Sequence, residues 1–207
     1  MIVPENTVLV LLAAGRSERF GNVGSKLEEE FLGRPLGYHV AVALEAVPFM
    51  ARVAIVDGGR LDYTRYGFTH VHNDDPARGM SQSVRLGVTE TMRLGAAAVV
   101  IALADMPRVT ATHIYHLFDA ATGEDSVVAS SDGKDTKPPV LFGRAQFEAL
   151  LTLEGDAGAR DMVKRGRHVV TNPAELIDVD TREELEQLRE LVHAPEALTR
   201  AGARRLG

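Results

Sequence analysis

The apolar residues of this chain fall into short runs that alternate with segments of helical periodicity. The run from Ala97 to Leu103 is apolar on both faces, as is typical of a central strand in a parallel sheet. By contrast, Leu185, Leu188 and Val192 recur at the spacing of one helix face. This alternation predicts an α/β fold, a three-layer α/β/α sandwich around a Rossmann-like, mostly parallel sheet. The predicted strands are 7–12, 52–56, 68–72, 97–103, 126–130, 138–142, 168–171 and 176–179, and the predicted helices are 35–47, 81–94, 110–121, 144–152, 158–165 and 181–193.

The length of the chain and the absence of a linker predict a single domain. A chain of 207 residues is large enough for one full core. The domain is expected to span residues 1–193, with a last helix that starts at the capping-box pair Thr181 and Glu184. Residues 194–207 have no clear apolar stripe, so we expect a surface tail there.

Composition narrows the class of protein. The net charge of −6 disfavours general nucleic-acid binding, and the absence of Cys excludes disulfides and thiolate metal sites. No apolar run approaches the roughly 18 residues that a membrane helix needs, and the first residues lack the features of a signal peptide. We therefore expect a cytoplasmic protein without membrane or nucleic-acid partners. The His residues form no zinc set, and His113 and His116 are expected at the surface.

The segment after the first strand has the features of a phosphate-binding loop. Strand 7–12 runs into Ala13–Gly21, which is rich in small residues and contains Arg16 and Arg19, and Lys26 follows. Small residues let backbone N–H groups approach an anion, and the cations neutralise its charge. The alternative is an ordinary turn between a strand and a helix.

This loop departs from two common nucleotide-binding patterns. Phe20 stands where the P-loop has its second Gly, and Leu27 follows the lysine in place of Ser or Thr. Ser17 stands where the dinucleotide fingerprint has its second Gly, which argues against a doubly wound NAD-binding protein.

Carboxylates at the ends of later predicted strands could hold a magnesium ion. Asp105 follows strand 97–103, and Pro107 ends the extended segment just beyond it. Mg²⁺ prefers oxygen ligands such as this carboxylate. Asp178 and Asp180 lie two apart on a predicted strand and would share a face. Asp178 is favoured over Asp180 as the second ligand. Helix caps or turns are the alternative roles for all three.

The segment after strand 68–72 opens a helix with polar residues. Gly79, Ser81 and Ser83 lie at its start, where free backbone N–H groups can bind a phosphate or a base or ribose edge. By itself this pattern indicates only a Ser-capped helix.

Taken in order, these motifs resemble those of the nucleotidyltransferase family that includes molybdenum cofactor cytidylyltransferase. Its loop reads L-A-A-G-x-S-x-R-x-G followed by Lys, and its later motifs are N-x₅-G-M-x-x-S, D-M-P, G-D-x-G-A-R and D-I-D-T. The resemblance covers residues 7 to about 191 and implies a fold of the nucleotide-diphospho-sugar transferase type. Lys137 and Pro138 stand where the family has Gly and His.

The resemblance implies an Mg²⁺-dependent enzyme that joins a phosphate monoester to a nucleoside triphosphate and releases pyrophosphate. The implied substrates are CTP and molybdopterin carrying molybdenum, with a molybdoenzyme as a further partner. Arg19 and Lys26 would hold the triphosphate, and Asp105 with Asp178 or Asp180 would bind the metal. The implied nucleotide-binding residues are Leu12, Ala13, Ala14, Gly15, Arg16, Ser17, Asn73, Gly79, Met80, Ser81 and Ser83, and the implied substrate-side residues are Lys137, Asp156 and Arg160.

Two other functions compete with this interpretation. A cytidylyl- or guanylyltransferase acting on a sugar or polyol phosphate would keep the first loop and Asp105 but change the substrate side. A carrier that binds the nucleotide or cofactor without turnover would fit the departure at Pro138 and the long gap before Lys26. CTP is expected over GTP because members that use CTP resemble this chain in having Ala at position 14, where guanylyltransferases have Gly.

Overall fold

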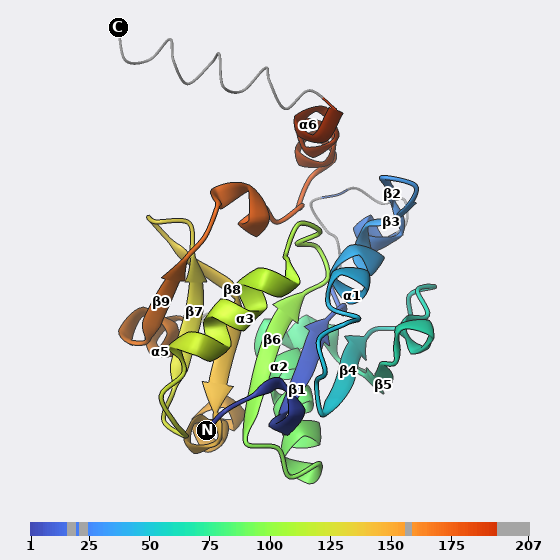
Figure 1. Cartoon of the computed structure of the whole chain (residues 1–207). Helices are drawn as coiled ribbons and strands as arrows, with labels where there is room; N and C mark the ends of the chain where they lie inside the picture. Colours follow the sequence, from blue (N-terminus) through green and yellow to red (C-terminus); the bar gives the residue numbers. More distant parts are fainter. Residues whose placement is uncertain (16–19, 21–24, 156–158, 194–207) are drawn as a thin grey trace, which may run out of the picture.

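The structure is a computed structural model that describes residues 1–15, 20, 25–155 and 159–193. Its centre is a seven-stranded sheet in the order β5-β4-β1-β6-β8-β7-β9. Among the described strands of this sheet, only β8 runs antiparallel to its neighbours, so the sheet is mostly parallel, as predicted (Figure 1). The strands are β1 (Thr7–Leu12), β4 (Ala51–Val56), β5 (Thr69–His72), β6 (Ala98–Leu103), β7 (Val127–Ser131), β8 (Thr136–Gly143) and β9 (Arg167–Val170).

Helices cover both faces of the sheet and complete the three predicted layers (Figure 1). Strand β1 shows why: Leu9 and Leu11 enter the core beneath one layer of helices, and Val8 and Val10 enter the core on the other face. The helices are α1 (His39–Ala43), α2 (Met80–Arg93), α3 (Ala111–Ala120), α4 (Phe147–Leu151), α5 (Arg160–Arg165) and α6 (Arg182–His193).

Helix α2 packs unusually close to the sheet. A Cβ atom on Gly87 would lie 2.5 Å from Cγ1 of Val10, so only glycine fits between α2 and β1. This close approach holds the start of α2 near the carboxyl end of β1. That end is where open α/β sheets place their ligands.

A separate, small apolar cluster fastens α6 to the rest of the chain. Leu185 and Leu188 of α6 pack with Phe31 and Leu36. Phe31 lies in a two-stranded hairpin of β2 (Glu30–Phe31) and β3 (Arg34–Pro35), and Leu36 follows this hairpin directly. Buried Val179 joins the same cluster. The sequence pattern did not predict this hairpin, because its strands are only two residues long.

The predicted strand 176–179 is wrong. Pro173–Leu176 is a short 3-10 helix, capped by the side chain of Asn172 and started by Pro173, and residues 177–180 follow as an irregular segment. Helix α1 is shorter than the predicted helix 35–47. A 3-10 turn (Leu36–Tyr38) precedes α1, and the side chain of Arg52 binds carbonyl groups beyond the end of α1.

Strand β6 and His113 also differ from expectation. β6 pairs in parallel with β1 but antiparallel with β8, so it is not a wholly parallel strand. His113 is buried rather than at the surface, and its Nε2 lies 2.6 Å from Oγ of Ser130. Because that hydroxyl donates to the carbonyl of Pro139, Nε2 of His113 must donate to it. Among the described residues, Nδ1 of His113 has no partner.

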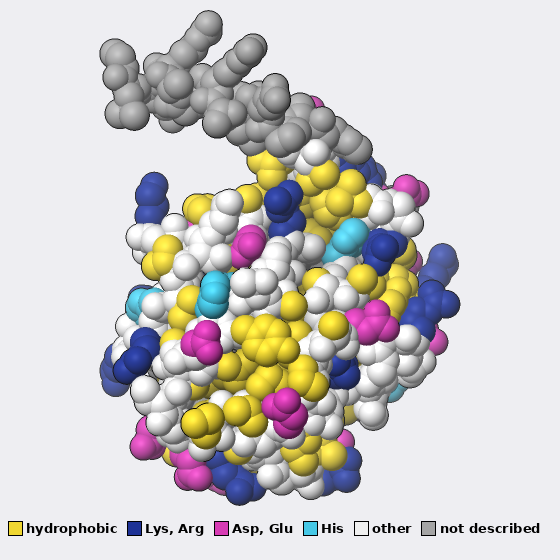
Figure 2. Space-filling view, viewed as in Figure 1, with side chains coloured by type: hydrophobic (Ala, Val, Ile, Leu, Met, Phe, Trp, Pro, Cys, Tyr) yellow, Lys and Arg dark blue, Asp and Glu magenta, His cyan; other side chains and the backbone are white. Residues whose placement is uncertain are grey.

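On the face seen in Figure 2, the described Lys and Arg side chains form no concentrated basic patch. Hydrophobic side chains gather near its middle, whereas Lys and Arg side chains are scattered toward its edges (Figure 2). No helix in the described part of the chain is long and apolar enough to cross a membrane.

Candidate active site

Three of the predicted motifs line one cavity of about 420 Å³ at the carboxyl ends of β1 and β6. The first loop contributes one wall, and the start of α2 contributes another. Gly79 caps α2 with a φ of 78°, a left-handed conformation that favours glycine. The cavity is lined by Leu12, Ala13, Ala14, Gly15, Lys26, Leu27, Pro76, Ala77, Gly79, Met80, Ser83, Leu103 and Asp105.

Backbone hydrogen bonds hold the ends of the central strands in register at this cavity. The amide of Ala13 donates to the carbonyl of Ile55, and the amide of Ala104 donates to that of Leu12. The first loop therefore leaves the sheet between the ends of β4 and β6. This topology brings Asp105 next to the loop, as the sequence predicted.

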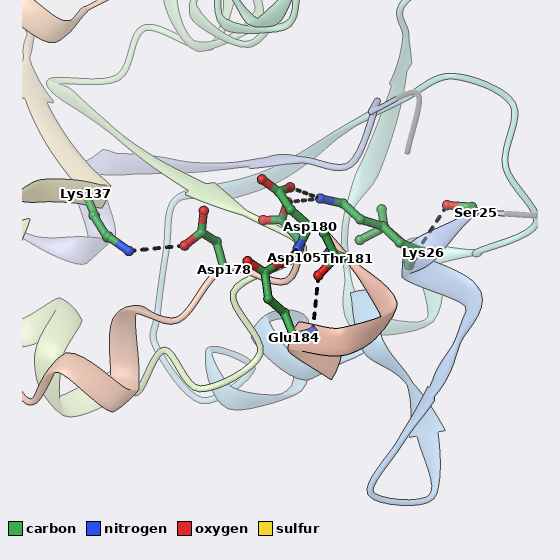
Figure 3. Close-up of polar contacts among 9 residues, drawn as sticks. Ser25, Lys26, Asp105, Lys137, Asp178, Asp180, Thr181 and Glu184 are labelled. Atoms are coloured by element: carbon green, nitrogen blue, oxygen red, sulfur yellow. Dashed lines mark hydrogen bonds and ion pairs between the residues drawn. The ribbon is translucent and has the colours of Figure 1, made fainter. Parts of the chain in front are cut away.

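Lys26 joins two of the predicted carboxylates. Its Nζ lies 2.7 Å from Oδ2 of Asp105 and 2.7 Å from Oδ1 of Asp180 (Figure 3). The local turn explains how the lysine is delivered: Lys26 starts a 3-10 helix that is capped by Ser25, whose hydroxyl accepts a hydrogen bond from the amide of Leu27. The long gap before Lys26 therefore does not keep it from the cavity.

The segment that carries Asp178 and Asp180 is tied directly to Asp105. The amide of Val179 donates to the carbonyl of Asp105 at 3.0 Å, and the Val179 side chain is fully buried. The following helix is fixed by the predicted capping box, in which Glu184 accepts from the amides of Asp180 and Thr181 (Figure 3).

Asp178 and Asp180 do not share a strand face, because the predicted strand is absent. They contact different lysines: Asp180 contacts Lys26, and Oδ1 of Asp178 lies 3.1 Å from Nζ of Lys137 (Figure 3). Lys137 also donates to the carbonyl of Leu176. Lys26 therefore pairs with two carboxylates at this end of the sheet, and Lys137 pairs with a third.

Burial perturbs the charged pair at the centre of the site. It raises the pKa of Asp105 despite the opposing effect of Lys26. Burial alone would lower the pKa of Lys26, but the carboxylates of Asp105 and Asp180 outweigh it, and the pKa is raised. Lys26 is therefore an ammonium ion at neutral pH.

The other predicted residues have distinct positions. Asn73 is buried, and its side-chain amide donates a hydrogen bond to Oγ of Ser83 at 3.0 Å. This bond links the segment after β5 to the start of α2. Ser81 is also buried, and its amide donates to the carbonyl of Gly155. Arg160 is exposed at the start of α5. Arg16, Ser17, Arg19 and Asp156 lie outside the described residues.

Sequence reasoning missed four residues that line the cavity. Pro76 and Ala77 stand within a segment already singled out, so their position was within reach of the pattern. Leu27 and Leu103 flank Lys26 and Asp105 and carry no chemical signal of their own. The pairing of Lys26 with Asp180 joins residues 154 positions apart, which no local pattern reveals.

The described residues contain no group of three or more His, Cys, Asp or Glu side chains arranged to hold a metal ion. Lys26 lies between two of the carboxylates. One acceptor nevertheless has no partner among the described residues, the buried Oδ1 of Asp105. An unpaired carboxylate oxygen beside a second carboxylate suits a hard cation.

The comparisons with known proteins agree with this fold. Residues 9–171 match the family described as the MobA-like NTP transferase domain. The chain is 30% identical over 210 residues to the purine catabolism protein PucB of Bacillus subtilis, with 87% of this chain and 94% of that protein covered. The fold and the family match together define a nucleotidyltransferase.

Solved structures have the same fold. The structure of Rv0371c from Mycobacterium tuberculosis is 26% identical with a TM-score of 0.72, and the match covers 91% of this chain and all of that one. A structure of Rv0371c in complex with manganese is 25% identical with a TM-score of 0.66, covering 89% and 98% of the two chains. The chain belongs to the MobA-like NTP transferase family.

Proposed function

We propose that this protein transfers CMP from CTP to a molybdopterin cofactor and releases pyrophosphate. The observation that carries the proposal is the cavity in which the first loop, the start of α2, Lys26 and Asp105 meet. This cavity combines small residues that admit a nucleotide with a buried cation and a carboxylate whose side chain is only 17% exposed. The family match favours turnover over a carrier without catalytic activity.

In the proposed reaction, a phosphate oxygen of the acceptor attacks the α-phosphorus of CTP. A new P–O bond forms as the bond to the β-phosphate breaks, and pyrophosphate leaves with the electron pair. Transfers of this kind depend on positioning and charge neutralisation more than on covalent catalysis. Lys26, with Arg19 from the first loop, would hold the triphosphate and stabilise the leaving pyrophosphate.

Asp105, with Asp180 or Asp178, would hold the magnesium ion. The unpaired, buried Oδ1 of Asp105 fits that role. Bound there, Mg²⁺ would act as a Lewis acid and stabilise the negative charge on the phosphates. The manganese complex of Rv0371c supports a divalent cation in a relative of this fold.

The preference for CTP rests on Ala14. Its side chain is half-buried and lines the cavity, so its methyl group takes room that a glycine would leave free. A pyrimidine needs less room than a purine, but packing alone discriminates by only about 1–3 kcal/mol. Hydrogen bonds from the segment around Gly79 and Ser83 would supply further discrimination.

The acceptor is the least constrained part of the proposal. Lys137 and Pro138 depart from the pattern of cytidylyltransferases for molybdopterin, and Lys137 lies beside Asp178 at the edge of the site. A sugar or polyol phosphate is therefore the second candidate acceptor. Either acceptor would present a phosphate monoester to the same α-phosphorus.

A product assay separates these possibilities. The purified protein is incubated with Mg²⁺, each of the four nucleoside triphosphates, and either molybdenum-loaded molybdopterin or a panel of sugar and polyol phosphates. Pyrophosphate release is measured together with the mass of the product. The proposal predicts a cytosine dinucleotide product from CTP and molybdopterin. Turnover confined to a sugar or polyol phosphate, or to GTP, would contradict it.

A further inference from the structure

The ammonium of Lys26 lies between the two carboxylates that are proposed above to hold the metal ion. It is 2.7 Å from an oxygen of Asp105 and 2.7 Å from an oxygen of Asp180. A divalent cation that bound both carboxylates would compete with this ammonium, whose contacts with them are drawn in Figure 3. A cation bound to Oδ1 of Asp105 alone would have a single carboxylate ligand. It would also lie beside the positively charged ammonium of Lys26. In either case, Lys26 opposes metal binding.

The second lysine of the site is held differently. The side chain of Lys26 is only 10% exposed, whereas those of Lys137 and its partner Asp178 are 33% and 46% exposed. Charges act more strongly where solvent is excluded and are screened where solvent enters. Lys26 should therefore control the local potential at Asp105, and Lys137 should affect it much less.

We propose that Lys26 is a tethered cation that blocks the divalent-metal position until a nucleoside triphosphate draws the lysine away, so that metal and triphosphate bind cooperatively. This inference rests on the proposed function only in assuming that a triphosphate enters the cavity. It does not depend on which base or acceptor is used.

The position and flexibility of Lys26 make this exchange feasible. Lys26 lines the cavity itself, so a triphosphate placed there is within reach of its ammonium. A lysine has a long flexible stem and a compact charge, which lets it change partners without a backbone movement. Once its ammonium contacts phosphate, Lys26 no longer offsets the negative charge of Asp105 and Asp180, which can then attract a divalent ion.

Cooperativity of this kind is reciprocal. If the triphosphate increases the affinity for metal, the metal increases the affinity for triphosphate by the same factor. The free protein should then bind divalent ions weakly, although Asp105 and Asp180 both lie 2.7 Å from the same ammonium. This arrangement would keep the metal position closed in the absence of nucleotide.

Metal binding without nucleotide tests the inference directly. Mn²⁺ affinity is measured by electron paramagnetic resonance for the wild type, Lys26→Met and the matched variant Lys137→Met. Both substitutions remove one positive charge. We expect Lys26→Met to bind Mn²⁺ at least about tenfold more tightly than the wild type, and Lys137→Met to change the affinity by less than about threefold. Adding Asp105→Asn to Lys26→Met should abolish the gain.

Two results would overturn the inference: no gain in Lys26→Met, or an equal gain in Lys137→Met, which would indicate a general charge effect. Thermal unfolding checks that each variant is folded. Lys26→Gln provides a second neutral variant that can still donate a hydrogen bond to one of the two carboxylates.

A measurement on the wild-type protein covers the case in which both Lys26 variants fail to fold. The chain has only the lysines Lys26, Lys134, Lys137 and Lys164, so the ¹⁵N resonance of the Lys26 ammonium can be assigned by substituting the other three. Inorganic tripolyphosphate in metal-free buffer should shift that resonance. If it shifts the resonances of other lysines but leaves Lys26 unchanged, the exchange does not occur. These probes contain neither CTP nor an acceptor, so an error in the proposed substrates would leave their outcome unchanged.

Discussion

Two cavities of nearly equal size lie at opposite ends of the sheet. One, of about 420 Å³, is formed at the carboxyl ends of β1 and β6 and contains Lys26 and Asp105. The other, of about 460 Å³, is formed where β7 and β9 begin and is lined by residues that include Asp125, Asp161 and Arg165. By volume alone, the two would be equal candidates for a binding site.

The exposure of their charged residues distinguishes the two cavities. Lys26 is buried and the side chain of Asp105 is only 17% exposed, whereas Asp125, Asp161 and Arg165 are all exposed to solvent. Charge that is held out of water acts on a ligand with far less screening. The comparison indicates that buried charge at the carboxyl ends of parallel strands, and not cavity volume, distinguishes the site.

The largest expected effect comes from removing the buried carboxylate. Asp105→Asn should reduce the rate by about 10²–10³-fold, because one charged ligand for the phosphate-bound metal is lost. The fold should persist because Asn has nearly the same shape. Steady-state rates and circular dichroism measure both outcomes. Asp161→Asn, in the second cavity, is the control and should leave the rate unchanged; equal losses in the two variants would remove the distinction between the cavities.

A smaller effect is expected from the buried cation. Lys26→Ala should weaken nucleoside triphosphate binding by about 1.5–3 kcal/mol, the range for a lost hydrogen bond to a charged group. Isothermal titration calorimetry in the presence of Mg²⁺ measures the change. Arg165→Ala removes a cation from the second cavity and should have no effect. Unchanged affinity in Lys26→Ala would show that the lysine serves only its ion pairs with Asp105 and Asp180.

A change in selectivity is expected from the wall of the first cavity. Ala14→Gly should shift the relative affinity from CTP toward GTP by about 1–3 kcal/mol, because one methyl group leaves the space beside the base or ribose. Competition binding between the two nucleotides measures this shift. Ala120→Gly removes a methyl group from the second cavity and should leave the CTP-to-GTP ratio as it is. If Ala14→Gly also leaves the ratio unchanged, selectivity has another source.

The smallest effect concerns a buried polar group that belongs to neither cavity. Burial lowers the pKa of His113 from its ordinary value of 6.5, so the folded protein binds fewer protons than the unfolded chain below that pH. The stability contributed by neutral His113 is complete above pH 6.5 and declines as the pH falls through that value toward the folded pKa. The slope cannot exceed about 1.4 kcal/mol per pH unit for one group.

His113→Gln isolates this contribution, because Gln retains a donor for Ser130 but does not titrate. The free energy of unfolding in urea is measured for both proteins at about pH 7 and about pH 5.5. The variant should lose less stability than the wild type over this interval. Parallel losses in the two proteins would assign the acid sensitivity to other groups, such as His39, whose pKa burial also lowers.

Local patterns predicted most elements of the fold for a plain physical reason. The strands β1, β4 and β6 are short apolar runs, and α2 and α3 have helical periodicity, so burial and backbone geometry favour one outcome at each place. The errors fall where a single residue redirects the chain. Asn172 and Pro173 start a 3-10 helix that runs to Leu176, where a strand was predicted to begin, and Arg52 binds the carbonyls beyond α1.

The sequence by itself determined the class of this protein: an α/β fold with small residues after β1, a lysine nearby, and Asp105 at the end of β6. These features are local, and each follows from a few neighbouring residues. The tertiary structure alone decided which charges meet. Lys26 contacts Asp105 and Asp180 across 79 and 154 positions of the chain, and Lys137 contacts Asp178 across 41. Such pairings depend on how separate elements pack, because electrostatic energy is set by distance in space and by burial, and neither is written in local sequence.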